Sequence, residues 1–265
     1  MGSRAVTGFF LALVALISAA LPAPPVESLP DNSTADYQLG GAYEPASGVD
    51  VLTRDRTEKP ADGLYNICYV NAFQTQPGEL PWWEAHHPGL LLRSADGDLI
   101  RDPDWADEVL LDIRTEAKRR QLSRIEHAWF KDCAESGYQA VEPDNLDSWT
   151  RSDGLLTRSM AVAFARHMIS RAHGFGLAIG QKNSAELDGH RLGFDFAVAE
   201  ECEVYWECAT YLRTFGRNVI EIEYTDNGRA AFRRACSTRG HQIAVLLRDR
   251  DLAAANHRDY VYEAC

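Results

Sequence analysis

Two carboxylic acid side chains stand at the ends of short apolar runs in the sequence. Asp144 closes Val141-Glu142-Pro143-Asp144, and Glu200 follows Ala197-Val198-Ala199. Buried parallel strands are typically apolar runs, and barrels of alternating strands and helices gather their active sites at the strands' carboxyl ends. Cleavage of a glycosidic bond usually needs two carboxyl groups, one as proton donor and one as nucleophile or base. We therefore predict Asp144 and Glu200 as the catalytic pair.

The sequence leaves open which of the two acids gives the proton. The longer glutamate side chain reaches a leaving oxygen more easily, and apolar surroundings can raise its pKa, which favours Glu200 as the general acid. Asp144 is then the nucleophile or base. Glu201 alternates in direction with Glu200 and is expected to point elsewhere, and Asp195 is interpreted as a structural acid within its strand.

The segment around Asp144 is rich in oxygen donors, with three carboxylates and one amide in six residues. We predict that Glu142, Asn145 and Asp147 help to bind a substrate. A solvated acidic turn is the alternative, because Asp, Asn and Pro are common in turns. A divalent-cation site is a third interpretation, but no histidine ligand accompanies these acids and the spacing of a calcium loop is missing, so we predict no metal and no cofactor.

Polar and aromatic residues follow other apolar runs as well. Lys182 and Asn183 come after Leu177-Ala178-Ile179-Gly180, where the lysine could hold a sugar hydroxyl or a carboxylate, unless it is a plain surface residue. Glu223-Tyr224 combines an acid with an aromatic ring, as sugar-binding walls do. Trp149 and Trp206 follow the two acidic strand ends and are candidate stacking platforms.

These side chains need a scaffold of strands, and the sequence alternates strand-like runs with helix-like stretches. The predicted strands are Tyr37–Leu39, Val49–Leu52, Leu64–Val70, Val109–Ile113, Tyr138–Glu142, Leu177–Gln181, Phe194–Ala199, Val219–Glu223 and Ile243–Leu247. The clearest predicted helices are Thr115–Ser136 and Leu156–Gly174, each with apolar residues at helical spacing. This order predicts an α/β fold, a single-domain (β/α)8 TIM barrel, although nine predicted strands exceed the eight that it requires.

The N-terminus predicts export. Residues 1–20 carry Arg4, an apolar core and small residues, which is typical of a secretory signal peptide, and the core is far shorter than the roughly 20 residues that span a bilayer. A Pro/Ser-rich leader at 21–35 then precedes a barrel domain at 36–265. We predict a secreted, extracellular protein with no membrane span after cleavage.

The charge and the cysteines restrict the partners and the compartment. The formal net charge is −12, and loss of Arg4 with the signal makes it −13, which argues against nucleic acid and favours a cationic partner. Six cysteines in an exported chain predict disulfides, with Cys202 and Cys208 the favoured pair. Cys68 lies within an apolar run and is interpreted as a buried residue. The chain contains no Gly-x-Ser-x-Gly elbow, phosphate loop or dinucleotide fingerprint, which excludes those chemistries.

Several motifs in one order resemble a known family. They are Tyr37-Gln38-Leu39-Gly40-Gly41, Val49-Asp50-Val51 with Asp55, Ile67-Cys68-Tyr69, Leu111-Asp112-Ile113-Arg114, Glu142-Pro143-Asp144-Asn145-Leu146-Asp147, Gly180-Gln181-Lys182-Asn183, Phe194–Cys202 and Glu223-Tyr224. Together they resemble the glycoside hydrolase family 114 domain, whose named activity is endo-α-1,4-polygalactosaminidase. Two segments depart from the family's usual pattern, Val70–Gln76 and Ala199.

The resemblance implies a (β/α)8 barrel that cleaves α-1,4-linked galactosamine polymers with Asp144 and Glu200. It also implies a Cys202–Cys208 disulfide and a cationic amino-sugar polysaccharide as partner. Its motifs place Gln38, Asp55, Tyr69 and Asp112 among the candidate substrate-binding residues. We expect a monomer. The alternatives are a non-catalytic carbohydrate-binding barrel, a hydrolase that acts on a different polysaccharide, and a metal-dependent hydrolase that uses Glu142, Asp144 and Asp147.

Overall fold

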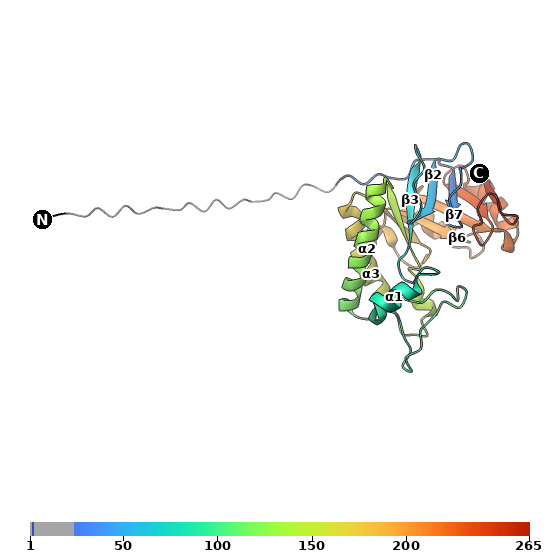
Figure 1. Ribbon diagram of the computed structural model, residues 1–265. Coiled ribbons are helices and arrows are strands. Elements are labelled where there is room, and N and C mark those ends of the chain that lie inside the picture. The colour runs from blue at the N-terminus through green and yellow to red at the C-terminus, as the bar shows by residue number, and fades with distance from the viewer. Residues whose placement is uncertain (1, 3–23) are drawn as a thin grey trace.

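A computed structural model describes Gly2 and residues 24–265, so the predicted signal peptide lies outside the described residues except for Gly2. The chain folds into a nearly closed barrel (Figure 1). Eight parallel strands follow one another around it in sequence order: β1 Ala35–Gln38, β2 Val51–Asp55, β3 Tyr65–Asn71, β4 Ala140–Asp144, β5 Ala178–Lys182, β6 Phe196–Glu200, β7 Val219–Tyr224 and β8 Ala244–Arg248. The predicted TIM-barrel architecture is confirmed.

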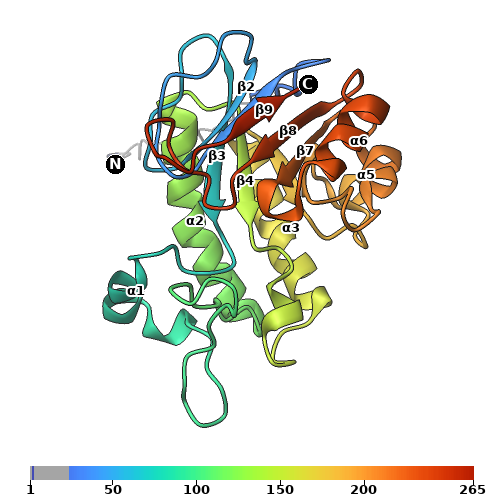
Figure 2. The ribbon, with the colours of Figure 1, turned by 90° about the vertical axis from the view of Figure 1, so that its right-hand side faces the viewer.

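A ninth strand, which the sequence analysis missed, lies at the seam of the barrel. β9, Tyr262–Ala264, pairs antiparallel with β8 (Figure 2). The Tyr262 hydroxyl donates a 3.0 Å hydrogen bond to the Ala35 carbonyl of β1. Arg248, fully buried at the end of β8, reaches across the same seam. Its guanidinium pairs with Asp36 at 3.3 Å and donates to the Tyr37 carbonyl, so side chains reinforce a junction at which the backbone forms the isolated bridge between Gly40 and Ala253.

Helices cover the later strands of the barrel. The longer ones are α2 Glu116–Ser136, α3 Arg158–Gly174, α5 Cys208–Phe215 and α6 Ala230–Arg239, with short α1 Leu80–His86 and α4 Gly189–Leu192. In the described part of the chain, loops take the place of helices after β1 and β2. The two predicted helices agree with α2 and α3. Thr115 caps the start of α2, where its hydroxyl accepts a hydrogen bond from the Lys118 amide, and Thr157 caps α3 in the same way with the Met160 amide.

The predicted strand Val109–Ile113 is wrong as a barrel strand. The segment from Ala72 to Arg114 forms an insertion between β3 and α2 that carries α1 and a short antiparallel ribbon, with isolated bridges such as Leu91 to Leu111 and Arg101 to Val109. Its apolar residues are buried, which explains the strand-like pattern, but they pack against the barrel's outer core. The other eight predicted strands correspond to β1 to β8, and β9 is the ninth strand of the structure.

The barrel interior is filled by side chains from alternate strand positions. Val51, Ile67, Val198, Ile222 and Leu246 belong to this inner cluster, and Leu29 of the N-terminal leader packs against it. Gly180 makes room there, because a Cβ at that position would lie 2.6 Å from the Phe196 ring. The packed interior leaves the polar side chains at the strands' carboxyl ends as the floor of a cleft.

Three disulfides join all six cysteines: Cys68–Cys133, Cys202–Cys208 and Cys236–Cys265. The predicted Cys202–Cys208 pair is therefore confirmed. Cys68, interpreted as a buried residue, is buried but also bonded, since α2 carries Cys133 against the outer face of β3. Among the described residues, none of the helices combines the length and apolar character needed to cross a membrane.

Candidate active site

A cleft of about 990 Å³ opens at the carboxyl ends of the strands. Its floor includes Asp144 at the end of β4, Lys182 at the end of β5 and Glu200 at the end of β6. Each of these three residues occupies the last position of its strand and shares the inward direction of the alternate residues before it. The fold thus brings together two acids that lie far apart in the sequence, as predicted.

Asp144 is held by three donors. Its Oδ2 accepts a 2.7 Å hydrogen bond from the Tyr69 hydroxyl, its Oδ1 accepts a 2.7 Å bond from the Asn145 amide, and Lys182 Nζ lies 3.5 Å from Oδ1. Asn145 has a φ of +65°, a conformation that asparagine tolerates better than most residues. The turn after β4 therefore fixes the direction of the carboxylate.

Glu200 is held from the neighbouring strands on both sides. Asn183, after β5, donates from Nδ2 to Oε2 at 2.9 Å and accepts the Glu200 amide at 2.9 Å, while the Tyr224 hydroxyl of β7 donates to Oε1. Burial raises the pKa of Tyr224 well above its usual value, with Glu200 adding to the rise, so this phenol keeps its proton. Both partners were predicted as substrate-binding residues and here position Glu200.

Lys182 is the buried cation between the acids. Its Nζ lies 3.4 Å from Glu200 Oε2, 3.0 Å from Glu142 Oε1 and 2.9 Å from the Tyr37 hydroxyl. Burial alone would lower the pKa of this amine, but Asp144, Glu200 and Glu142 raise it well above its usual value. The side chain is therefore charged, and it is no plain surface lysine.

Glu142 lies beneath the floor of the cleft, completely buried. Burial raises the pKa of its carboxyl to about 7, while Lys182 opposes that rise. The Tyr37 hydroxyl donates a 2.5 Å hydrogen bond to Oε1, and Oε2 has no partner among the described residues. Glu142 therefore supports Lys182 and does not line the cleft.

The other predicted substrate-binding residues divide into two groups. Asp55, Tyr69, Asn145, Asp147, Lys182, Asn183 and Tyr224 line the cleft. Three predicted residues do not. Gln38 is buried and hydrogen-bonded to Asp36 and Arg54. Asp112 is buried against Arg114 and Lys118. Glu223 faces outward from β7, where it accepts the Glu203 amide at 3.0 Å. Glu223 is one residue out of register with Tyr224, and neighbouring strand residues point to opposite faces.

Several cleft residues escaped the sequence analysis because they lie in loops. Trp105 and Glu108 come from the insertion before α2, Arg151 from the turn after β4, Tyr205 from the loop after β6, and Arg250 from the loop after β8. Glu201, expected to point elsewhere, turns at a φ of +56° and forms an ion pair with Arg250 at the cleft rim. The signal available in the sequence was the acids that flank these aromatic residues, Asp104 and Asp107 around Trp105 and Glu203 and Glu207 around Tyr205.

The two tryptophans chosen as stacking platforms have different surroundings. Trp149 packs against the outer core and is absent from the cleft lining. Trp206 is 76% exposed at the tip of the loop after β6, beside Tyr205, with the Arg234 guanidinium 5.5 Å from its ring centroid. Tyr205 and Trp105 are the exposed aromatic residues that line the cleft itself.

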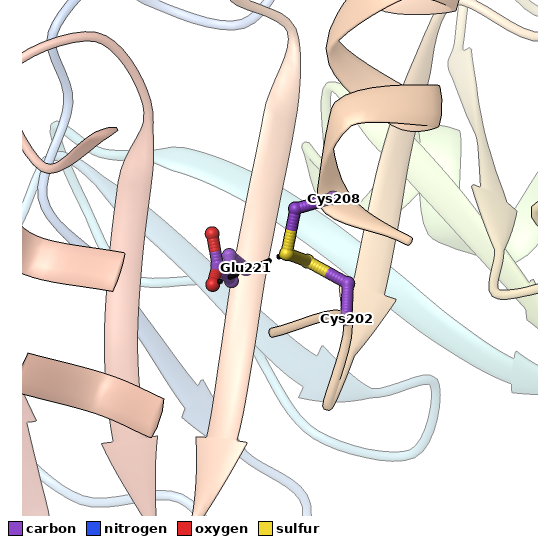
Figure 3. A group of neighbouring side chains, drawn as sticks. All are labelled: Cys202, Cys208 and Glu221. Carbon is purple, nitrogen blue, oxygen red and sulfur yellow. Dashed lines mark hydrogen bonds between the residues drawn. A yellow bond between two sulfur atoms is a disulfide. The ribbon is translucent and has the colours of Figure 1, made fainter. Parts of the chain in front are cut away.

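A disulfide closes the loop that carries Tyr205, directly after Glu201. Figure 3 shows Cys202 and Cys208 joined beside Glu221 of β7, whose Oε1 lies 3.5 Å from Cys208 Sγ. Because both sulfurs are bonded to each other, this group of residues offers no thiolate for a metal ion. Glu221 instead pairs with Arg239 of α6 at 2.6 Å. The disulfide anchors the loop to the outer side of the barrel.

The charge of the cleft is strongly acidic. Nine carboxylic acids line it, against the three cationic residues Lys182, Arg151 and Arg250. The acids are Asp55, Asp102, Asp104, Glu108, Asp144, Asp147, Glu200, Glu201 and Asp251. All three cations are already paired with these acids or with Glu142. Such a cleft attracts a cationic ligand and repels an anionic one.

Comparison with known proteins gives a family and many structural neighbours, two of which are described by their fold similarity. The model of glycoside-hydrolase family GH114 matches residues 17–265. The structure is similar to that of Aspergillus fumigatus Ega3 in complex with galactosamine, with a TM-score of 0.71 and 20% identity over 95% of this chain and 100% of that chain. The glycoside hydrolase domain of PelA from Pseudomonas aeruginosa has a TM-score of 0.58 and 16% identity over 86% of this chain and 98% of its own. No curated protein matches the chain. At these identities the two structures establish the fold.

Proposed function

The chain belongs to glycoside hydrolase family GH114 and is a glycoside hydrolase, and from this premise we propose that it cleaves α-1,4-linked galactosamine-containing polysaccharide through Asp144 and Glu200. The observation that carries the proposal is the arrangement of these two acids on either side of the Lys182 ammonium in an acidic cleft. Two carboxyl groups across one pocket are what hydrolysis of a glycosidic bond requires.

The separation of the acids favours retention of configuration. Because Lys182 Nζ lies 3.5 Å from Asp144 Oδ1 and 3.4 Å from Glu200 Oε2, those two oxygens are at most about 7 Å apart. Inverting enzymes hold their carboxyl groups roughly 6.5 to 9.5 Å apart to admit a water molecule, whereas retaining enzymes hold them about 5 Å apart. The upper limit here overlaps only the lowest part of the inverting range.

The steps follow from that assignment. Asp144 attacks the anomeric carbon while Glu200 gives its proton to the leaving glycosidic oxygen, so the C–O bond breaks and a glycosyl ester forms on Asp144. Water then attacks the anomeric carbon, its proton passes to Glu200, and the ester bond breaks to restore Asp144. Tyr224 suits a residue that changes its protonation, because its hydroxyl can donate to a carboxylate and accept from a carboxylic acid.

The substrate is inferred from charge and from the neighbour. Galactosamine has a free amine, which is an ammonium at neutral pH, unlike the neutral acetamido group of the N-acetylated sugar. The acidic cleft therefore raises the local concentration of a polymer built from galactosamine. Ega3, which has a similar fold, is described in complex with galactosamine. Exposed Trp105 and Tyr205 offer rings for stacking on sugars. We also propose that the protein is secreted, which its three disulfides and its predicted signal peptide support, and that it acts as a monomer.

The test is the release of soluble oligosaccharides from de-N-acetylated α-1,4-galactosamine polymer. We expect release by the wild type and a loss of at least about a thousandfold in Asp144→Asn and Glu200→Gln, because each removes one of the two groups that act as a unit. Asp132→Asn and Glu135→Gln on the exposed face of α2 are matched controls and should retain activity.

The outcomes separate the alternatives. Polymer binding without release by the wild type would support a carbohydrate-binding barrel instead of this enzyme. Release from fully N-acetylated or neutral polysaccharide, with none from the cationic polymer, would keep the two carboxylates and replace the substrate. Activity that disappears with a chelator would point to the metal-dependent mechanism.

A further inference from the structure

Glu108 is a further carboxyl group of the cleft, beside the proposed catalytic pair, and the insertion between β3 and α2 supplies it. It is 7% exposed and lines the same cavity as Asp144. Its Oε2 accepts hydrogen bonds from two side-chain amides, Asn71 Nδ2 at 2.8 Å and Asn145 Nδ2 at 3.4 Å. Within residues 24–265 its Oε1 has no hydrogen-bond partner, yet it is not sealed in the interior. One oxygen is thus anchored and the other is free towards the cleft.

We propose that Glu108 binds the ammonium group of a galactosamine residue next to Asp144, and so makes the enzyme prefer the free amine to the N-acetylated sugar. This inference rests on the proposed function and adds a determinant of specificity to it. An ammonium donates up to three hydrogen bonds, and its positive charge is the counter-charge that the buried Glu108 carboxylate lacks. An acetamido group is neutral and bulkier and supplies neither property.

Among residues 24–265, no cation forms an ion pair with Glu108. The charge of Arg151 lowers the pKa of Glu108, but the Arg151 guanidinium pairs with other acids of the cleft wall. It lies 2.5 Å from Asp102 and 2.9 Å from Asp147, and it donates to Asn145 Oδ1 at 2.6 Å. Buried carboxylates are costly unless they are paired, so the site is completed when a substrate cation arrives.

The electrostatics of the wall agree with this geometry. Burial raises the pKa of Glu108 to about 7, and Asp144 and Asp102 add to the rise while the bond from Asn71 and the charge of Arg151 oppose it. Tyr69 of β3 faces the same group as a neutral phenol, since burial raises its pKa well above the usual value. Near neutral pH the carboxyl is therefore close to its point of ionisation, and a bound ammonium shifts it to the charged form.

The variant Glu108→Gln tests the proposal with little change in shape. Glutamine can present its carbonyl oxygen to Asn71 and Asn145 as Oε2 does now, while its amide nitrogen replaces the free oxygen and repels a cation. We expect KM for the de-N-acetylated polymer to rise at least about tenfold with kcat within about threefold, because a hydrogen bond to a charged group is lost. Glu84→Gln on exposed α1 is the matched control.

A series of polymers with increasing N-acetylation supplies the decisive comparison. The wild type should lose kcat/KM steeply as amines are acetylated, and Glu108→Gln should lose it more gently because it no longer distinguishes the two groups. An unchanged KM together with an unchanged dependence on acetylation would overturn the inference. A wild type that releases nothing from any member of the series would instead overturn the proposed function.

A second variant covers a failure of Glu108→Gln to fold, which circular dichroism would reveal. Glu108→Asp keeps the charge but withdraws it by one methylene, so KM for the amine polymer should rise by a smaller factor and the preference for amines should remain. Equal KM values for Glu108→Asp and the wild type would also count against the proposal.

Discussion

Lys182 Nζ lies 3.5 Å from Asp144 Oδ1, at the centre of a cluster that includes Glu200 and the fully buried Glu142. The ammonium holds the two acids at a fixed separation. Because the lysine is only 3% exposed, water does not compete for its hydrogen bonds to them. Preorganised charge of this kind, buried away from water, is the largest single contribution to catalysis in many enzymes.

Replacement of Lys182 should therefore abolish most of the activity. We expect Lys182→Met to lower kcat about a hundredfold or more, measured as oligosaccharide release, since the reacting carboxylates lose their common partner. Stability should fall by about 3 to 5 kcal/mol as well, because Glu142 is left buried without its counter-charge. Denaturant unfolding measures that loss.

The double variant Lys182→Met with Glu142→Gln separates the two effects. It removes both charges of the buried pair, so most of the lost stability should return while activity stays low. Recovery of activity together with stability would show that Lys182 acts only as a structural residue.

Glu223 should make the protein less stable as the pH rises. Burial raises the pKa of this carboxyl to about 7, the Glu203 amide bonds one of its oxygens, and the other has no partner among the described residues. Between the unfolded pKa of about 4.5 and the folded value, the folded state binds more protons than the unfolded state, so stability declines with rising pH.

The variant Glu223→Gln should remove that part of the decline. We expect its free energy of unfolding to fall by about 1 to 3 kcal/mol less than that of the wild type between pH 5 and pH 8. Urea titrations at both pH values measure the difference, with exposed Glu135→Gln as the control. KM should be unchanged because Glu223 faces away from the cleft, and a raised KM would restore it as a substrate-binding residue.

The strand ends were predictable because local sequence and the alternation of the pleat agree there. Asp144, Lys182 and Glu200 each follow an apolar run of the right length, and the fold brings such positions to one face of the barrel. Glu223 failed the same reasoning by one position. Ile220, Ile222 and Tyr224 alternate with Glu221 and Glu223 along its strand, so the alternation itself places both glutamates on the face opposite to the inward Tyr224.

The insertion before α2 could not be predicted from its pattern. The run from Val109 to Ile113 is as apolar as a barrel strand, but its partners are loop residues distant in the sequence, so only tertiary packing decides its place. Glu108 precedes that run, and nothing in its local sequence shows that Asn71 and Asn145 will hold it in the cleft. The seam strand β9 is three residues long and depends on Arg248 and Tyr262 for its position.

Arg248 should be essential to the stability of that seam. It is fully buried, and its guanidinium bonds the carbonyls of Tyr37, Ala253 and Val261 as well as Asp36. We expect Arg248→Met to cost about 3 to 5 kcal/mol, because Asp36 and the carbonyls lose their buried partner. Arg258→Met at an exposed position should cost almost nothing in the same denaturation experiment. A loss below about 1 kcal/mol would show that β9 closes the seam without the arginine.

Two of the disulfides should have different effects: Cys202–Cys208 should matter more for activity, and Cys68–Cys133 should matter more for stability. Cys202–Cys208 spans six residues and Cys68–Cys133 spans 65, so the chain-entropy model gives about 2 kcal/mol for the first and about 4 kcal/mol for the second. The short loop carries Trp206 at a positive φ and follows directly on Glu201, which also has a positive φ, a backbone conformation that few such residues adopt without support.

Removing each bridge in turn tests that division. Cys202→Ala with Cys208→Ala should lose less stability but several-fold in kcat/KM, because the loop directly after Glu200 is released and Tyr205 leaves the cleft wall. Cys68→Ala with Cys133→Ala should lose more stability yet keep its specific activity well below the melting temperature, since that bridge joins β3 to α2 on the outer side of the barrel. Thermal unfolding and oligosaccharide release measured on the same samples decide it, and a reversed order of the two effects would show that the loop needs no covalent anchor.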